Sequence, residues 1–254
     1  MKLMIDTDAK TVTRQDGELV EVAPLYGNQA FEWLSREWVR VGWDLKYVYQ
    51  FTWMGRPIIQ MPEDMVRTQE VLYRVRPDVV IETGVAHGGS LIYYASLLKL
   101  QEKGRVIGVD IEIRPHNRRA IEAHEMSPLI TLIEGNSVGD EIVGRVRALV
   151  KPTDKVLVIL DSCHTKQHVL DELAAYAPLV TPGSYIVATD GVMRDLNDVS
   201  RGAPDWNWNN PAEAAIEFAA ANPEFVLESL PRTFSESPIE IEITHWPAAW
   251  LRRR

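Results

Sequence analysis

The sequence is poor in cysteine, because Cys163 is the only one among its 254 residues. A single thiol cannot form an intramolecular disulfide, and a structural zinc site built from paired cysteines is excluded as well. Long apolar runs are also lacking, since no stretch approaches the ~20 residues that span a bilayer. The chain reaches Asp6 and Asp8 too early for the apolar core of a secretory signal. We therefore expect a soluble, cytoplasmic protein with no membrane association.

Basic residues are outnumbered, with 27 Lys and Arg against 36 Asp and Glu and a formal net charge of −9. Such a chain does not bind nucleic acid through a general basic field, and charge does not hold it on anionic lipid. A small-molecule substrate is compatible with this balance. Hydrophobic residues make up 46% and charged residues 25%, which is ordinary globular usage and argues against disorder.

Residues 1–60 are predicted to form an extension in front of a main domain at residues 61–254. The polar stretch 1–22 has one turn signal, so it is either a hairpin or a loose arm. Helical spacing then predicts an amphipathic helix with Asn28 as a possible N-cap. The apolar positions that carry this spacing are Phe31, Leu34, Trp38 and Val41.

Aromatic residues are concentrated between Trp43 and Trp53. The residues are Trp43, Tyr47, Tyr49, Phe51 and Trp53. Core packing or an oligomer contact is the simpler interpretation. A substrate platform or lid is the alternative, because Tyr and Trp combine apolar faces with polar tips.

Apolar runs and helical patterns alternate from residue 62 onward. A helix at 62–76 is followed by expected strands at 78–83, 104–110, 130–134, 156–160 and 184–188. Helices are expected between them at 90–101, 118–124, 139–150 and 168–177. This alternation predicts an α/β fold with a Rossmann-like, doubly wound, mostly parallel sheet.

The last quarter of the chain is less regular. Residues 190–210 read as a long irregular segment, which is typical of a lid or binding loop. A helix at 211–222 and strands at 225–227 and 239–244 should follow. The arginines at 252–254 are expected to be a solvated end.

A glycine-rich turn follows the first strand of the main domain. In a doubly wound sheet, ligands bind at the carboxyl ends of the strands. Glycines at this turn allow close approach of a ligand, and a helix amino terminus adds free N–H groups. The sequence of this turn differs from the dinucleotide motif G-x-G-x-x-G. Glu82, just before the turn, suits a cationic or amino-acid-like ligand. A turn without any ligand is the alternative.

The second and third strands also end in polar residues. Asp110 lies where nucleotide-binding α/β folds hold a ribose diol, although a surface acid is the alternative. Asn136 and Ser137 either contact an adenine edge or cap the next helix.

Two acids and a histidine follow the fourth and fifth strands. Asp161 and Asp190 should face one crevice and form a site for Mg²⁺, which prefers oxygen ligands. His164 is a candidate general base beside them, with a polar loop residue as the alternative. Cys163 is expected to be a small buried filler.

Four stretches resemble the family called cephalosporin hydroxylases, which is similar to class I S-adenosylmethionine-dependent O-methyltransferases that methylate rhamnosyl and macrolide sugars. They are Gln60–Asp64, Ile81–Ser96, Val109–Asn117 and Leu160–Thr165. The resemblance covers about Phe51 to the end of the chain.

The resemblance implies a role for each matching position. Residues at the glycine turn would border the methionine part of the cofactor, namely Glu82, Gly84, Ala86, Gly88 and Ser90. Asp110 would bind the ribose, Asn136 and Ser137 would lie near adenine, and Asp161 would also lie beside the cofactor. Asp161 and Asp190 match metal ligands, and His164 matches the base.

One position departs from the family. Where the family often has two adjacent acids, this chain has Thr189 before Asp190, so a third metal ligand would be Asp195 or water. The implied reaction is Mg²⁺-assisted methyl transfer to a sugar hydroxyl. The substrate would be covered by the aromatic segment and the irregular loop, in particular by Tyr49, Trp53, Asp195 and Trp206.

Other functions fit parts of the same pattern. The chain could bind the cofactor without catalysis, as an accessory protein. It could be an NAD-dependent oxidoreductase, although the dinucleotide motif is missing. An iron oxygenase would need a second histidine, and His87 and His116 are poorly placed. The aromatic amino-terminal region favours a homo-oligomer.

Overall fold

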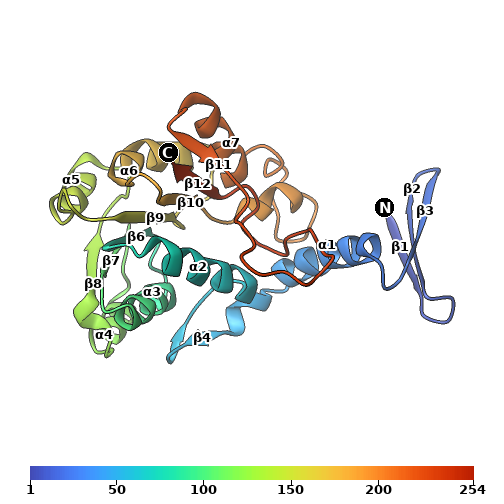
Figure 1. Ribbon diagram of the computed structural model, residues 1–254, viewed down its shortest axis with the longest axis horizontal. Helices are drawn as coiled ribbons and strands as arrows, with labels where there is room; N and C mark the ends of the chain where they lie inside the picture. The colour runs from blue at the N-terminus through green and yellow to red at the C-terminus, as the bar shows by residue number, and fades with distance from the viewer.

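The computed structural model describes residues 1–254, and a mixed seven-stranded sheet lies at its centre (Figure 1). The strands lie in the order β11-β12-β10-β9-β6-β7-β8. Their bounds are β6 Val79–Thr83, β7 Arg105–Asp110, β8 Ile130–Glu134, β9 Val156–Leu160, β10 Tyr185–Ala188, β11 Phe225–Leu227 and β12 Trp250–Arg253. Strands β6 to β10 are parallel to one another, and β12 is antiparallel to both of its neighbours. The predicted α/β, mostly parallel sheet is confirmed.

Helices cover both faces of this sheet. One face carries α2 Pro62–Val75, α3 Gly89–Leu100 and α4 Pro115–Glu122, and the other carries α5 Asp140–Ala148, α6 Lys166–Tyr176 and α7 Pro211–Ala221 (Figure 1). Successive strand residues alternate between the two apolar cores, as Val79 and Val80 do in β6. Strand order reverses between β6 and β9, so the carboxyl ends of these two strands form the switch point where doubly wound folds bind ligands.

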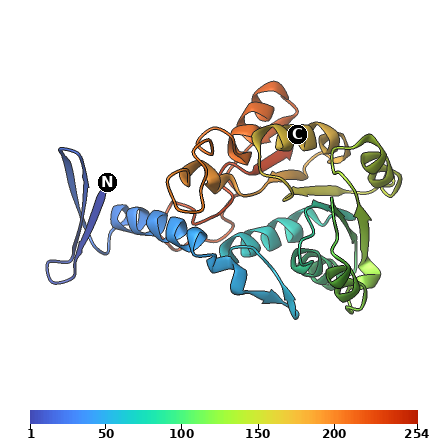
Figure 2. The same cartoon turned by 180° about the vertical axis from the view of Figure 1, so that it is seen from behind.

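The strands at the start of the amino-terminal extension stand away from this body (Figure 2). Strands β1 Lys2–Asp6, β2 Thr11–Asp16 and β3 Leu19–Pro24 form a three-stranded antiparallel sheet, where we expected a hairpin or arm. Helix α1 Asn28–Asp44 leads from it to the body. The helix begins at Asn28 with Gly27 as its N-cap, so Asn28 is not the N-cap. Its side chain instead donates to the carbonyl oxygen of Pro238.

The aromatic segment forms short elements after α1. A 3₁₀ helix spans Tyr47–Gln50, and the two-residue strands β4 Thr52–Trp53 and β5 Arg56–Pro57 pair with each other. Further 3₁₀ turns span Ser127–Leu129, Ala177–Leu179 and Gly191–Asp195. The last of these lies within the predicted irregular region at 190–210. None of the helices combines the length and the apolar character needed to cross a membrane.

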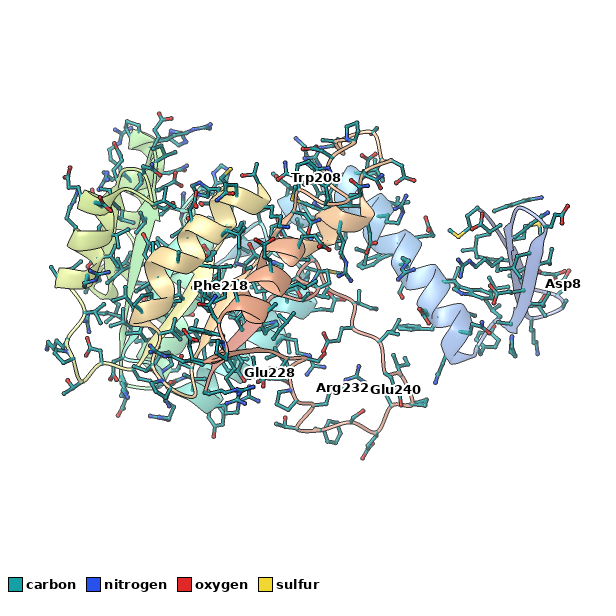
Figure 3. The ribbon with its side chains drawn as sticks, turned by 90° about the horizontal axis from the view of Figure 1, so that it is seen from above. Asp8, Trp208, Phe218, Glu228, Arg232 and Glu240 are labelled. Carbon is teal, nitrogen blue, oxygen red and sulfur yellow. The ribbon has the colours of Figure 1, made fainter.

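Two expectations at the carboxyl end were wrong. Residues 239–244 alternate like a strand but have no strand beside them, and the Arg232 guanidinium donates to the carbonyls of Ile239, Glu240 and Ile241 instead. The place next to β10 belongs to β12, which contains two of the arginines that we expected in a solvated end. Figure 3 shows Arg232 and Glu240 in this carboxyl-terminal segment, outside the sheet.

Candidate functional site

The glycine turn after β6 lies against the end of β9. Gly84 has φ +93°, and a Cβ there would lie 2.0 Å from the carbonyl oxygen of Asp161. A Cβ on Gly89 would lie 2.1 Å from the carbonyl oxygen of Pro57. The backbone can approach its neighbours this closely only without side chains. The glycines therefore bring the turn, the start of α3 and the end of β9 together around one small cavity.

This cavity has a volume of about 50 Å³. It is lined by the glycine turn from Gly84 to Ser90 together with Pro57, Ile59, Gln60 and Asp161. Five of the predicted cofactor positions, Gly84, Ala86, Gly88, Ser90 and Asp161, lie in its wall. Gln60 was not predicted individually, and its Nε2 donates to the Tyr94 hydroxyl at 3.0 Å.

Glu82 lies fully buried on β6 next to this turn. Ser90 Oγ donates to Glu82 Oε2 at 2.6 Å, whereas Glu82 Oε1 is buried and has no hydrogen-bond partner. Burial raises the pKa of this carboxyl to about 8, and the nearby charge of Asp110 adds to the shift. A buried carboxyl with a free acceptor oxygen fits a ligand that brings a positive charge or an N–H donor.

Asp110 at the end of β7 supports the glycine turn. Its Oδ2 accepts hydrogen bonds from the backbone N–H of Val85 at 2.7 Å and of Ala86 at 3.1 Å. The carboxylate is half-buried and keeps lone pairs for another donor. The structure thus gives Asp110 a local role, and the ribose contact stays a prediction.

The predicted adenine residues lie on the loop after β8. Asn136 is exposed, and its Oδ1 accepts from the N–H of Val138 at 3.3 Å. Neither residue caps α5, because the N-cap of that helix is Gly139. Ser137 is buried, and its Oγ lies 3.3 Å from Nε2 of His168.

A partly buried polar network, which the sequence did not predict, links this loop to the loop after β9. Ser162 Oγ lies 3.1 Å from His168 Nε2 and donates to Glu172 Oε1 at 2.7 Å. The hydrogen bond and charge of fully buried Glu172 raise the pKa of His168. The only sequence signal was the i, i+4 spacing of His168 and Glu172 on α6.

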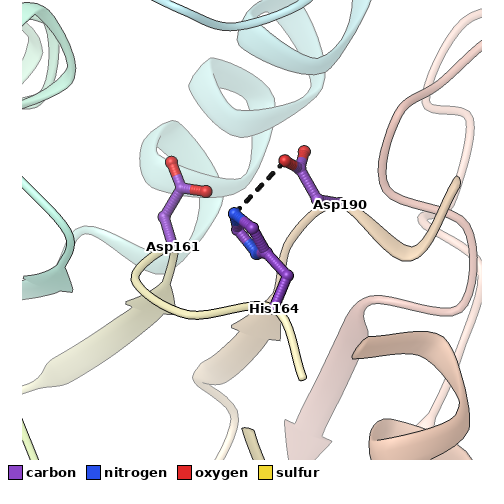
Figure 4. Close-up of side chains that lie close together, drawn as sticks. All are labelled: Asp161, His164 and Asp190. Atoms are coloured by element: carbon purple, nitrogen blue, oxygen red, sulfur yellow. Dashed lines mark ion pairs between the residues drawn. The ribbon is translucent and has the colours of Figure 1, made fainter. Parts of the chain in front are cut away.

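Asp161, His164 and Asp190 come together at the carboxyl ends of β9 and β10 (Figure 4). One ligand atom from each lies within 4.8 Å of the others. His164 Nε2 lies 3.5 Å from Asp190 Oδ2, and both side chains are about 30% exposed, at 28% and 29%. This is the cluster that the sequence predicted, and it is open enough for a small ligand to reach.

Two acidic side chains share this cluster, and neither forms an ion pair with a lysine or arginine. Burial and the charge of Asp190 raise the pKa of Asp161 well above its usual range, and His164 opposes the shift. Thr189 Oγ1 donates to Asp161 Oδ1 at 2.6 Å. The arrangement therefore offers two carboxylates and one imidazole to a cation, a proton or a hydroxyl.

Asp195 lies outside this cluster. It ends the 3₁₀ turn after Asp190, and its carboxylate lies 3.7 Å from Arg194 Nε. Its carbonyl oxygen accepts from the Arg40 guanidinium. It is not one of the three residues whose ligand atoms gather at the cluster. Cys163 is exposed rather than buried, because it lies on the loop beyond the end of β9.

The aromatic segment is largely engaged in packing. Trp53 Nε1 donates to Ser96 Oγ at 3.0 Å, and its ring lies edge-on to Tyr93 at 4.9 Å, so it packs on α3. Trp206 packs edge-on against Trp43 at 5.3 Å. Tyr49 is 53% exposed, with Lys46 Nζ 5.4 Å from its ring centre. Contacts of these residues with a substrate stay predictions.

Asp64 and His245 are two buried residues near the cluster that sequence reasoning did not single out. Asp64 is 3% exposed, and burial raises its pKa to about 7, with the charge of Asp190 adding to the shift. Burial lowers the pKa of His245, and the charges of Asp190 and Glu63 oppose this. The only available signal was the Gln60–Asp64 stretch.

Comparisons with known proteins identify the family. The model of the family described as Rhamnosyl O-methyltransferase/CmcI matches residues 45–254, and the chain belongs to this family. Rhamnosyl O-methyltransferase of Mycobacterium leprae (strain TN) is 33% identical over 141 residues, which are 55% of this chain and 59% of that protein. The match therefore spans less than two thirds of this curated relative.

Solved structures share the fold. A structure of CmcI with Mg-SAM superposes with a TM-score of 0.53 at 18% identity, covering 81% of this chain and 77% of that one. MycE methyltransferase from the mycinamycin biosynthetic pathway, in complex with Mg and SAH, gives a TM-score of 0.50 at 18% identity, with coverages of 94% and 65%. At these identities the likeness establishes the α/β fold alone.

Proposed function

We propose that this member of the Rhamnosyl O-methyltransferase/CmcI family is an S-adenosylmethionine-dependent O-methyltransferase. Its acceptor would be a hydroxyl of a sugar or of a glycosylated natural product. The observation that carries the proposal is the meeting of Asp161, His164 and Asp190 beside the glycine turn. Family membership and the names of the relatives support the same reaction and the same class of acceptor.

The residues around the small cavity fit the cofactor. The unpartnered Glu82 Oε1 would accept from the ammonium of the methionine part, and the N–H groups at the start of α3 would face its carboxylate. Gly84, Ala86, Gly88 and Ser90 would border this part. Asp110 would take the ribose hydroxyls, with Asn136 and Ser137 near the adenine.

The acid cluster fits Mg²⁺. Asp161 and Asp190 are hard oxygen ligands, and water would complete the coordination because Asp195 lies elsewhere. Burial and, after it, the charge of Asp190 raise the pKa of Asp161, and a cation beside it would favour the ionised carboxylate. The CmcI and MycE structures contain Mg, which supports this choice of ion.

His164 would act as the general base. When bound, the cofactor supplies a methyl group on a sulfonium, and Mg²⁺ lowers the pKa of a hydroxyl that it coordinates. His164 Nε2 would take the hydroxyl proton as the oxygen bonds to the methyl carbon, and the carbon–sulfur bond would break to leave the neutral thioether of S-adenosylhomocysteine. Asp190, 3.5 Å from that nitrogen, would stabilise the imidazolium that forms when Nε2 takes the proton. Holding oxygen and methyl in line would contribute much of the rate gain.

A homo-oligomer is part of the same proposal. The amino-terminal extension exposes several large apolar side chains, and an exposed apolar patch favours an interface. They are Leu19, Val20, Val22, Tyr26, Val41 and Leu45.

Titration calorimetry with S-adenosylmethionine, and separately with NAD, tests the proposal at its root. We expect micromolar binding of S-adenosylmethionine and no heat with NAD. A panel of glycosides, assayed with and without Mg²⁺, would then identify the acceptor. Folded protein that binds no S-adenosylmethionine would contradict the proposal, and binding without methyl transfer to any glycoside would favour an accessory protein.

A further inference from the structure

Asp64 is a buried acid without a basic partner. It lies in the first turn of α2 with 3% of its surface exposed, and it is not the N-cap, which is Met61. Thr244 Oγ1 donates to its Oδ1, and the N–H of His245 donates to its Oδ2 at 2.9 Å. Both carboxylate oxygens of Asp64 are thus used to hold a segment that lies 180 residues further along the chain.

We call this segment, residues 244–249, the strap. Thr244 Oγ1 also accepts from the N–H of Trp246 at 2.8 Å, so the Asp64 contact begins a tight turn. The strap then leads into β12, which pairs with β10. It therefore connects the start of α2 to the strand that ends just before Asp190.

The strap contacts the backbone on both sides of Asp190. The carbonyl of His245 accepts from the N–H of Val192 at 3.0 Å, and the carbonyl of Ala249 accepts from the N–H of Ala188 at 3.0 Å. Gly191 lies so close that a Cβ would come within 2.4 Å of the carbonyl oxygen of Pro247. Three residues within two positions of Asp190 thus contact one segment.

Asp190 needs such support because its backbone is left-handed, with φ +57°. A residue with a Cβ is disfavoured in this region and stays there only when its surroundings hold it. The left-handed turn also directs the Asp190 carboxylate toward His164 (Figure 4). The position of the carboxylate thus depends on the strap.

We propose that Asp64 is a positioning residue for the metal ligand Asp190. Asp64 anchors the strap through Thr244 and His245, and the strap fixes the backbone around Asp190. The importance of this positioning for catalysis rests on the proposed methyltransferase function. The link from Asp64 through the strap to the backbone around Asp190 does not depend on that function. Within the Gln60–Asp64 stretch, only Gln60 lines the cofactor cavity. Anchoring the strap gives Asp64 a separate role.

Three variants separate positioning from general stability. Asp64→Asn removes one acceptor oxygen, and Thr244→Val removes only the hydroxyl, so the second variant tests the link even if the first folds poorly. Thr68→Val is the matched control. Thr68 is buried one turn further along α2, and its Oγ1 donates to the backbone carbonyl of Asp64 at 2.8 Å and makes no hydrogen bond to the strap.

Hydrogen exchange tests the mechanical link in metal-free protein. We expect the amide of Val192 to exchange about tenfold faster in Asp64→Asn and Thr244→Val, because a hydrogen bond to a carboxylate is among the stronger ones. Thr68→Val should leave that amide unchanged even if it lowers the melting temperature. Unchanged Val192 exchange in both strap variants would overturn the proposal.

Mn²⁺ binding, followed by electron paramagnetic resonance, tests the consequence for the site. We expect about tenfold weaker Mn²⁺ affinity in both strap variants, since one carboxylate is no longer held, with S-adenosylmethionine affinity within about twofold of wild type. If Thr68→Val lost as much Mn²⁺ affinity as the two strap variants, Asp64 would act only through general stability, and the proposal would be overturned. If wild-type protein binds no Mn²⁺, the metal part of the proposed function fails, while the exchange experiment still decides the link.

Discussion

Thr189 and Asp161 form a partly buried hydrogen bond at the ends of two neighbouring strands, with Thr189 Oγ1 2.6 Å from Asp161 Oδ1. The Thr189 side chain is fully buried, and the same hydroxyl lies 2.9 Å from the carbonyl oxygen of Leu160. A hydroxyl has one proton, so donation to Asp161 fixes one oxygen of that carboxylate. A threonine at this position therefore orients the neighbouring acid without adding a second charge.

Replacing Thr189 tests this role. Thr189→Val keeps the shape but removes the donor, so we expect the pKa of Asp161 to rise further and Mn²⁺ affinity to fall by about tenfold. Thr189→Ser keeps the hydroxyl and should bind Mn²⁺ like wild type. The titration is read by electron paramagnetic resonance. Equal affinity in the valine variant would show that the hydroxyl does not orient Asp161 for a cation.

His164→Ala should remove turnover and leave cofactor binding intact. A positioned general base contributes about 10²–10⁴-fold to a rate, and His164 reaches the cluster only through its ring nitrogen. Methyl transfer is measured in a single turnover with radiolabelled cofactor, and affinity by calorimetry. Turnover within a few-fold of wild type would remove His164 from the mechanism.

Asp161→Asn should abolish the response to Mg²⁺. The substitution removes one of the two carboxylates that would hold the ion and leaves Asp190 alone, so the rate plotted against Mg²⁺ concentration should become flat at a low value. Asp171→Asn is a control on exposed α6 surface, where Gln167 is its hydrogen-bond partner. An unchanged Mg²⁺ titration in Asp161→Asn would exclude this residue as a metal ligand.

Stability should fall as the pH rises from about 5 to 8. The pKa of Glu82 is raised from 4.5 to about 8, so in this range the folded state holds a proton that the unfolded chain has released. Unfolding is then favoured by higher pH, with a slope of up to about 1.4 kcal/mol per pH unit for one proton. The pKa of Asp64 is raised from 3.8 to about 7, so this residue also lowers the stability as the pH rises between these two values.

Glu82→Gln separates the two contributions. Urea unfolding between pH 5 and 9 should show a shallower pH slope in this variant, because glutamine does not titrate. Asp64 should still contribute up to about pH 7. Saturating S-adenosylmethionine should flatten the wild-type slope, since a bound ammonium favours ionised Glu82. An identical slope in Glu82→Gln and wild type would show that burial does not raise the pKa of this carboxyl.

The exposed apolar side chains of the extension should support self-association. Leu19→Glu combined with Val22→Glu introduces charge on β3, where these residues are 60% and 61% exposed, and should lower the molar mass in solution to that of one chain. Leu100→Glu, an 82% exposed position on α3, is the control. Light scattering after size exclusion gives the molar mass. A monomeric wild-type protein would contradict the expected oligomer.

Much of the fold could be predicted because the signals are local. Five apolar runs alternate with helical patterns, and β6 to β10 lie within one residue of the expected bounds. Chain order together with the right-handed crossover then brings the carboxyl ends of these strands to one edge. Asp161, His164 and Asp190 follow from this placement, since each comes within a few residues of a strand end.

The errors occur where distant segments compete for one place. Residues 239–244 have the alternation of a strand, but β12 occupies the edge beside β10, and alternation alone does not choose between them. For Trp53 the sequence leaves core packing and a substrate platform open; the ring packs on Tyr93 and Ser96, and a substrate contact stays a prediction. A bulky aromatic side chain serves either purpose, and its neighbours decide which.

The sequence by itself determined the class of fold, the glycine turn and the identity of the acids at the strand ends, because these depend on residue type and short spacing. Only the tertiary structure decided how those acids are held. Asp64 reaches Thr244 across 180 residues, and the strap that begins there fixes the turn at Asp190. Hydrogen bonds between segments so far apart leave no periodic trace in a sequence, since they depend on where the packed elements meet.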